Sequence, residues 1–314
     1  MTEQSLDSAN TICIPIGYSS NDKLFISVII PAYNREHYLD LCLTSLFKQN
    51  FSSSKYEVIL INDNSTDNTK KLLEKYSKQY VNLNVINNSN KKGSDYARAL
   101  GIKNANADII VFTDSDCILP SDWLSKIAKK FENRKVLCVQ GTQKCEGKWG
   151  KFMHEGEKSL QILKKKRALD TKNLAIRKNL IVKYPFNKTL SNTGDYELGQ
   201  RLSKDIIIHY DSNITVKHVC DNFSSSIKRG ERWGKAAAYI YKTYGAERIN
   251  KRLKLPLYLL FFFYLAGLFY FSFKYKSFRG GIMFFVTTFL TAFYFKKTLI
   301  MVTWISKNET KRYY

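Results

Sequence analysis

The chain has 314 residues, of which 44% are hydrophobic and 25% charged, and its formal net charge is +23. The apolar content excludes an intrinsically disordered chain, and the length allows one large domain or two small ones. The charge favours anionic partners, such as nucleic acid, anionic lipid or phosphorylated substrates, without choosing among them. Its distribution is uneven, because the last 64 residues contain 12 of the 20 phenylalanines and +10 of the net charge. We therefore expect a folded domain followed by a basic, aromatic membrane segment.

The N-terminal part and the cysteines give two further expectations. Residues 1–24 lack the charged and then apolar pattern of a secretory signal, so we expect a polar lead-in there. None of the six cysteines forms a C-x-x-C pair, which indicates buried free thiols in a reducing compartment.

Apolar runs alternate with segments of helical spacing in the first part of the chain. Strands are predicted at 25–30, 58–61, 81–86 and 109–112, and helices at 38–47, 66–80 and 94–104. This alternation predicts an α/β fold with a mostly parallel sheet and helices on both faces. Ligands bind such sheets at the carboxyl ends of the strands. The polar residues directly after each apolar run are therefore the candidate site.

The pattern loosens after residue 112. Helices are predicted at 123–131, 198–202 and 227–244, and strands at 136–139, 206–210 and 214–219. Residues 141–190 are basic and irregular.

Four polar clusters follow apolar runs or begin a helix, at residues 31–35, 62–67, 113–116 and 193–197. In the first, a proline stops the strand, and an ordinary strand-to-helix turn is an alternative explanation. In the second, Ser65 to Asp67 suit a helix N-cap. Asp63 directly follows the buried strand, where a carboxylate can accept a hydrogen bond from a nucleobase. In the fourth, acidic residues also suit the start of a helix, where the macrodipole favours negative charge.

The third cluster contains two carboxylates at i and i+2, Asp114 and Asp116, directly after an apolar strand. Their mutual repulsion requires a counter-charge. A Mg²⁺ or Mn²⁺ ion bound to diphosphate oxygens supplies one, because both ions favour carboxylate and phosphate oxygen ligands. A solvated turn is the alternative for this pair.

Five motifs follow one another along the chain: Ser27–Asn34 (SVIIPAYN), Glu57–Asp67 (EVILINDNSTD), Lys92–Gly93 with Arg98, Phe112–Asp116 (FTDSD) and Thr193–Gly199 (TGDYELG). In this order and spacing they resemble the family 2 glycosyltransferases, over roughly residues 25–220. The resemblance implies a GT-A fold, which is Rossmann-like. It also implies an enzyme that uses a nucleotide-diphospho-sugar, needs a divalent metal and inverts the anomeric carbon.

The resemblance assigns roles to single residues. Asp195 matches the catalytic base, which would take the proton of an acceptor hydroxyl as that oxygen attacks C1 of the sugar. Tyr33 would stack on the nucleotide base, and Asp63 would accept a hydrogen bond from it. The implied donor-binding set is Pro31, Tyr33, Asn34, Asp63, Gly93, Arg98, Asp114 and Ser115.

The implied cofactor is Mn²⁺ or Mg²⁺, bound by Asp114 and Asp116, and it would neutralise charge on the departing diphosphate. His218 follows a strand and is a candidate third metal ligand or diphosphate contact, with a structural histidine as the alternative. Glu197, Arg232 and Trp233 are candidates for the acceptor or membrane side.

Two positions depart from the family pattern. Asn64 replaces the usual glycine, which is compatible because Asn also accepts positive φ. Gly194 replaces the glutamate that commonly precedes the base, so Glu197 remains a rival to Asp195 for that role. Arg229–Trp233 resembles a signature of processive members, but it begins with arginine in place of glutamine, and we infer no processivity.

Two apolar runs predict a helical hairpin near the C-terminus. Leu255–Phe273 has 19 uncharged residues, enough to nearly span a ~30 Å hydrocarbon core, and Gly280–Phe295 has 16. The expected topology is a transmembrane hairpin with both ends cytoplasmic, with basic residues on either side of it inside. The basic loop at 274–279 counts against this topology, and an interfacial or re-entrant hairpin is the alternative. The expected organisation is a lead-in (1–24), a glycosyltransferase domain (25–225), a basic interfacial helix (226–252), the hairpin (253–305) and a basic tail (306–314).

Together these features predict a membrane-anchored, inverting, hexosyltransferase-like enzyme on the cytoplasmic face of a membrane. It would transfer a sugar from a nucleotide-diphospho-sugar to a lipid-linked or nascent glycan, as in cell-surface polysaccharide synthesis. Its further partner would be the anionic membrane surface, and no motif indicates nucleic-acid binding. The alternative is a non-catalytic membrane scaffold with a nucleotide-sugar fold, against which four intact aspartates argue: Asp63, Asp114, Asp116 and Asp195.

Overall fold

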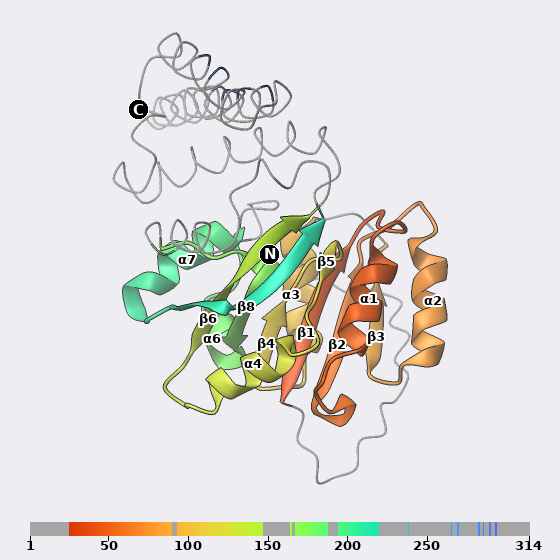
Figure 1. Cartoon of the computed structure of the whole chain (residues 1–314), viewed down its shortest axis with the longest axis horizontal. Helices are drawn as coiled ribbons and strands as arrows, with labels where there is room; N and C mark the ends of the chain where they lie inside the picture. The colour runs from red at the N-terminus through yellow and green to blue at the C-terminus, as the bar shows by residue number, and fades with distance from the viewer. Residues whose placement is uncertain are drawn as a thin grey trace, which may run out of the picture. The chain divides into compact units, whose positions relative to one another are not determined.

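The computed structural model describes residues 25–89, 93–146, 164, 167–187 and 194–219, and isolated positions at 238, 265, 269, 282, 285, 289 and 293. The chain divides into two compact units, residues 1–146 with 154–219 and residues 147–153 with 220–314. All elements named below belong to the first unit (Figure 1). Within the described residues no helix combines the length and apolar character that crossing a membrane requires. Apart from those isolated positions, the expected interfacial helix, hairpin and tail, with Arg232 and Trp233, lie outside the described residues.

The described strands form one eight-stranded sheet in the order β3-β2-β1-β4-β7-β6-β8-β5. Their bounds are β1 (Ile26–Ala32), β2 (Tyr56–Asn62), β3 (Leu83–Asn87), β4 (Ile109–Phe112), β5 (Cys117–Ile118), β6 (Cys138–Glu146), β7 (Leu174–Arg177) and β8 (His209–Val219). Strands β3, β2, β1 and β4 are parallel to one another, as predicted. The other half differs, because β7 is antiparallel to both β4 and β6, and β5 is antiparallel to β8. The sheet is therefore mixed.

Helices cover both faces of the sheet, as the alternation predicted (Figure 1). Along β1, Val28 and Ile30 pack with one face's helices and Ile29 with those of the other, because successive strand residues point to opposite sides. The first face is covered by α1 (Leu39–Phe47), α2 (Thr69–Gln79) and α4 (Trp123–Phe131). The second is covered by α3 (Ser94–Asn104), α6 (Lys178–Lys183) and α7 (Gly194–Asp205). Each buried Leu or Ile side chain contributes about 1.5–3 kcal/mol through loss of apolar surface from water.

Every residue of β1 and β2 is buried, as expected for central parallel strands. The polar exceptions are hydrogen-bonded: the hydroxyl of Ser27 donates to Oε1 of Glu57 at 2.6 Å. The same carboxylate accepts from the backbone and side-chain amides of Asn106, at 2.6 and 3.0 Å. These bonds offset the cost of burying a charged group between two strands.

The last described strand, β8, secures the turn that follows β4. It pairs in parallel with β6 and antiparallel with β5, where His218 lies opposite Cys117. The backbone N–H of Val219 also donates to the carbonyl oxygen of Asp116 at 3.0 Å. The predicted strands at 206–210 and 214–219 are thus largely one strand, with a register irregularity near Gly141 of β6.

Three elements lie wholly where the sequence indicated only irregular, basic chain. These are β7, the helix α6 that follows it and the short 3-10 turn η3 (Thr171–Asn173) before it. A similar turn, η1 (Ser53–Lys55), precedes β2. Asn173 anchors η3, since its side-chain amide donates to the carbonyl oxygens of Thr142 and Ile214, and its oxygen accepts from the indole of Trp123.

Candidate active site

The candidate site lies at the carboxyl ends of β1, β2 and β4, together with η3 and the start of α7. The loops after the three strands contain residues 33–35, 63–67 and 113–116. Backbone bonds align them: Asp63 N–H donates to the carbonyl of Ala32, and Thr113 N–H to that of Ile29. The structure therefore brings three of the four predicted clusters to one edge of the sheet, as a parallel arrangement requires.

Pro31 does not stop the first strand, contrary to the prediction. It is buried inside β1, opposite Ile61 of β2. Strand β4 already ends opposite Ile29, so β1 has one neighbour at this point, and a proline is tolerated where a strand becomes an edge. Pro31 thus supports the loop from within the sheet, and half-buried Tyr33 begins the loop itself.

The loop after β1 is joined to the loop after β2 through Asn34. Its backbone N–H donates to the hydroxyl of Ser65, and its side-chain oxygen accepts from the backbone of Thr66 at 2.8 Å. Asn34 and Asn64 both have positive φ, 51° and 63°, which asparagine tolerates well. The expectation for Asn64 is confirmed, whereas the side chain of Asn34 is engaged within the loops.

Asp63 links the end of β2 to the start of α3. Its side chain is buried, with Oδ1 accepting from the amide of Asn88 at 2.7 Å and Oδ2 from the backbone N–H of Gly93 at 2.8 Å. Gly93 has φ 94°, a backbone conformation that favours glycine. These two bonds fix the orientation of the Asp63 carboxylate at the end of β2.

Arg98 points from α3 to the Asp-x-Asp turn. Its guanidinium is buried and donates to Oδ1 of Asp95 at 3.0 Å and to Oδ1 of Asp114 at 2.8 Å. Burial lowers the pKa of Arg98, but the two carboxylates outweigh this effect and keep it above its ordinary value. Arg98 is therefore a permanent cation, and it fixes the orientation of Asp114.

Asp116 presents an oxygen that lacks a donor. Its Oδ1 is buried and accepts no hydrogen bond from the described residues, although Nε2 of His218 lies 3.4 Å away. Oδ2 lies 3.7 Å from the guanidinium of Arg35. Burial disfavours the charge, yet His218 and Arg35 together lower the pKa of Asp116 to about 2. Burial likewise lowers the pKa of His218, but Asp116 outweighs it and raises that pKa to about 9. Ser115, between the two aspartates, is buried.

Asp195 lies in the first turn of α7, beside η3. Its Oδ2 accepts from the backbone N–H and hydroxyl of Thr171, at 3.1 and 3.2 Å. Burial, and then the negative charge of Asp170, raise the pKa of Asp195 to about 6. Such a carboxylate is mostly ionised at neutral pH and is basic enough to accept a proton.

Glu197 is directed differently, although it is two residues away. It is buried and forms a two-point ion pair with Arg201, one helical turn later, at 2.8 and 3.0 Å. Arg201 in turn donates to the carbonyl oxygen of Pro185. This geometry favours Asp195 over Glu197 as the base.

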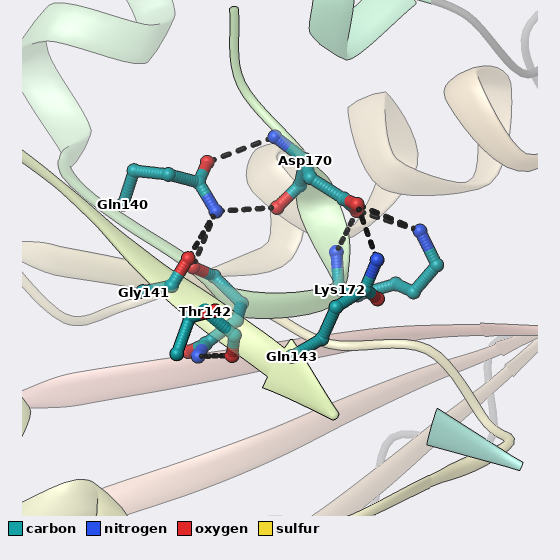
Figure 2. Close-up of a pocket in the computed structure, with 7 residues that line it drawn as sticks. Gln140, Gly141, Thr142, Gln143, Asp170 and Lys172 are labelled. Carbon is teal, nitrogen blue, oxygen red and sulfur yellow. Dashed lines mark hydrogen bonds and ion pairs between the residues drawn. The ribbon is translucent and has the colours of Figure 1, made fainter. Parts of the chain in front are cut away.

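The ion pair between Lys172 and Asp170, beside Asp195, was not predicted from the sequence. Nζ of Lys172 lies 2.8 and 2.9 Å from the two carboxylate oxygens of Asp170. Figure 2 shows Lys172 and Gln143 directed at this carboxylate and Gln140 bonded to its backbone. They line a small pocket with Gly141, Thr142 and Asn173. The signal available was polar residues 170–173 directly before the apolar run 174–176, within a stretch otherwise dominated by lysine and arginine.

A model of the family described as glycosyl transferase family 2 matches residues 27–194, more than half of the chain. The chain belongs to glycosyl transferase family 2. The family membership that the motifs indicated is therefore confirmed.

Individual proteins of known name or structure agree with family 2. Glycosyltransferase AglE of Haloferax volcanii is 27% identical over 236 residues, which cover 73% of this chain and 77% of AglE. The poly(ribitol-phosphate) beta-glucosyltransferase of Bacillus spizizenii is 39% identical over 100 residues, 32% of this chain but only 16% of that protein. The mannosyltransferase PcManGT of Pyrobaculum calidifontis, solved with GDP-Man and Mn²⁺, has a TM-score of 0.59 at 17% identity, over 72% of this chain and 66% of that one. The family 2 chain thus has a GT-A-like, mixed α/β fold.

The acidic residues of the site fit a divalent cation. Asp114 and Asp116 offer hard oxygen ligands, and Oδ1 of Asp116 is a buried acceptor to which no described residue donates. An ion there would take the place of the proton on His218, because a ligating imidazole must be neutral. The described residues contain no group of three or more His, Cys, Asp and Glu side chains arranged to hold an ion by themselves.

Proposed function

We propose that this family 2 protein is an inverting glycosyltransferase that moves a sugar from a nucleotide-diphospho-sugar to a hydroxyl group of a lipid-linked or growing glycan. One observation carries the proposal. A carboxylate of raised pKa, Asp195, belongs to the same partly buried charge network as Asp114 and Asp116, through Arg98 and Lys172. A base beside an Asp-x-Asp turn suits a reaction in which a hydroxyl loses its proton and a diphosphate departs.

In the proposed reaction, Asp195 accepts the proton of the acceptor hydroxyl. That oxygen forms a bond to C1 of the sugar, the bond between C1 and the diphosphate oxygen breaks, and its electron pair leaves with the diphosphate. Attack from the face opposite the leaving group inverts C1. The hydrogen bonds from Thr171 orient the carboxylate, and its pKa of about 6 suits proton transfer near neutral pH.

The negative charges of the donor's diphosphate are proposed to lie at the end of the network that contains Asp114 and Asp116. Asp114 and Asp116, with His218, would hold Mn²⁺ or Mg²⁺, which when bound neutralises charge on the departing diphosphate. Arg98 fixes Asp114, and partly exposed Arg35 adds positive charge beside Asp116. Tyr33 and Asp63 are proposed to bind the nucleotide base, by stacking and by accepting a hydrogen bond. The Mn²⁺ and GDP-Man named for PcManGT support this choice of cofactor and donor class.

The acceptor and the location belong to the proposal as well. The aromatic, basic segment 253–305 is proposed to anchor the enzyme, with the catalytic domain facing the cytoplasm and the basic ends contacting anionic lipid. A polymeric or lipid-linked acceptor fits this position. The name of the Bacillus spizizenii relative, which acts on poly(ribitol-phosphate), supports a cell-surface glycan as acceptor.

A donor panel tests the proposal. The full chain, in detergent or nanodiscs, is incubated with UDP-glucose, UDP-GlcNAc or GDP-mannose, with Mn²⁺ or with EDTA, and nucleotide release is measured. We expect release from at least one donor with Mn²⁺, abolition by EDTA, and a loss of at least 100-fold in D195N. D122N, which removes an exposed carboxylate directly before α4, is the matched control. Mn²⁺-dependent nucleotide binding without release from any donor would instead indicate the scaffold, and unchanged nucleotide release by D195N would refute the assignment of Asp195 as the base.

A further inference from the structure

Asp95 is a buried carboxylate with no role in the reaction as proposed above. It lies in the first turn of α3 and is 2% exposed. Its Oδ1 accepts from Arg98 at 3.0 Å, and its Oδ2 accepts from the backbone N–H of Gly194 at 3.0 Å. A single side chain thus joins α3 to the first residue of α7, 99 positions later in the chain.

The contact depends on the absence of a side chain at residue 194. A Cβ atom on Gly194 would lie 2.8 Å from Oδ2 and 3.0 Å from Cγ of Asp95, closer than such atoms approach. The backbone of Gly194 does not need the left-handed region, so the glycine is required for space. Asp95 and Gly194 therefore form a matched pair, at the position where the family pattern has a glutamate.

We propose that Asp95 is a positioning residue for the catalytic base: it fixes the first turn of α7, and so Asp195, and links that turn through Arg98 to Asp114. The inference rests on the proposed function, since it takes Asp195 to be the base. The first N–H groups of a helix lack intrahelical acceptors, and a carboxylate there is favoured both as an acceptor and by the macrodipole. A fixed first turn of α7 keeps the carboxylate oxygens of Asp195 in one position. This matters because small misplacements of a catalytic group strongly reduce the reaction rate.

The charge of Asp95 gives it a second effect on Asp195. Four charged groups influence Asp195, two from the η3 segment (Asp170 and Lys172) and two from α3 (Asp95 and Arg98). Beyond burial, Asp170 and Asp95 raise its pKa, whereas Arg98 and Lys172 lower it. Removing the charge of Asp95 takes away one group that raises the pKa of Asp195. It also leaves more of the positive charge of Arg98 to act on Asp195, so both changes lower this pKa.

One test needs no substrate. The amide that D195N introduces does not ionise, so the difference in Tm between a D195N variant and its parent grows with pH as Asp195 of the parent ionises. In the native background we expect the midpoint of this growth between pH 4 and 6. In a D95N background we expect the midpoint to move down by roughly one pH unit. In a D122N background, the control, it stays in place.

A second test uses the hydrolysis of the donor found by the panel. D95A is expected to lower kcat at least tenfold with KM for the donor within about twofold, because Asp95 positions the base and does not bind donor. G194A is expected to cause a similar loss in the native chain. It should add little to D95A, because the shorter side chain leaves room for the new Cβ. S203A, on the same helix, is the matched control.

The outcomes separate this inference from the proposed function. An unchanged midpoint in D95N, or a G194A loss of equal size in the native and D95A backgrounds, would overturn it. If no donor is hydrolysed by the native chain, the proposed function fails while the melting comparison still decides the role of Asp95. If D95A does not fold, as judged by circular dichroism, D95N and G194A carry the test, since D95N keeps a hydrogen-bond acceptor.

Discussion

Nη2 of Arg98 lies 2.8 Å from Oδ1 of Asp114, so the first aspartate of the Asp-x-Asp turn is oriented by a helix on the second face of the sheet. The guanidinium is 5% exposed and its second branch is bonded to Asp95. One cation therefore links the turn after β4 to the helix that precedes β4. The charge balance of the site depends on this arginine before any ligand is bound.

Substitution of Arg98 tests this relationship. We expect R98A to weaken Mn²⁺-dependent UDP binding by about 10–100-fold, as loss of a residue that orients a metal ligand commonly does. R98K keeps the charge but cannot donate to both carboxylates in a fixed fork, so an intermediate loss is expected. Calorimetric titration of UDP with and without Mn²⁺ measures both effects. Equal affinity of the R98A and native chains would contradict the assignment.

Substitution of Asp116 addresses the proposed metal site directly. The buried Oδ1 without a donor predicts that D116A loses the additional thermal stabilisation that Mn²⁺ gives in the presence of UDP. A ligand present at about 100 times its Kd stabilises by about 2.7 kcal/mol, so the expected loss is several degrees in Tm. D122N removes an exposed carboxylate outside the site, which provides the comparison. An undiminished Mn²⁺ effect in D116A would exclude this aspartate as a ligand.

The raised pKa of Asp195 makes stability depend on pH. The folded protein binds this proton more tightly than the unfolded chain, so the contribution of Asp195 to stability is greatest below about pH 4 and decreases until about pH 6. D195N avoids this loss, and we expect it to unfold with a free energy roughly 1–3 kcal/mol higher than that of the native chain at pH 7.5. The difference should disappear near pH 4. Thermal and denaturant unfolding across this range measure it, and a D195N protein that is less stable at every pH would contradict the expectation.

The Lys172–Asp170 pair predicts an effect on the base opposite to that of Asp95. Lys172 lowers the pKa of Asp195, so K172M should raise it and move the acid limb of the pH–rate profile upward. It should also destabilise the fold by about 1–3 kcal/mol, because the partly buried carboxylate of Asp170 loses its cation. The double substitution K172M/D170L removes both charges and should recover much of this stability. If the single and double variants are equally unstable, the pairing contributes little.

The first half of the sheet could be predicted because its apolar runs are long and bounded by polar residues. Strand β1 and the Asp-x-Asp turn are examples, and the carboxyl-end rule correctly indicated where three clusters would meet. The mixed second half could not be predicted in this way. Strand β7 has only three apolar residues, Leu174 to Ile176, among basic neighbours, and its antiparallel pairing with β4 and β6 is a long-range choice.

Single side chains followed the same division. Asp114 and Asp116 were singled out from a local pattern and Asp195 from the resemblance to the family, and the structure places all three in one charge network. Asp95 was missed because its bond to Gly194 joins two distant segments. Lys172 was missed although Asp170 is only two residues away, because the closeness of this pair to Asp195 depends on the packing of η3 against α7. Asn34 was assigned to the donor, but its side chain joins two loops, which no local pattern distinguishes from ligand binding.

The pairing of β5 with β8 has a consequence for the order in which the protein matures during translation. Cys117 lies opposite His218, so the turn bearing Asp114 and Asp116 gains its supporting strand about a hundred residues after it has been synthesised. A ribosome-bound chain that ends before residue 209 contains the loops after β1, β2 and β4 but lacks this support. Nucleotide binding is therefore expected to arise late and in one step, when β8 leaves the exit tunnel and completes the edge of the sheet.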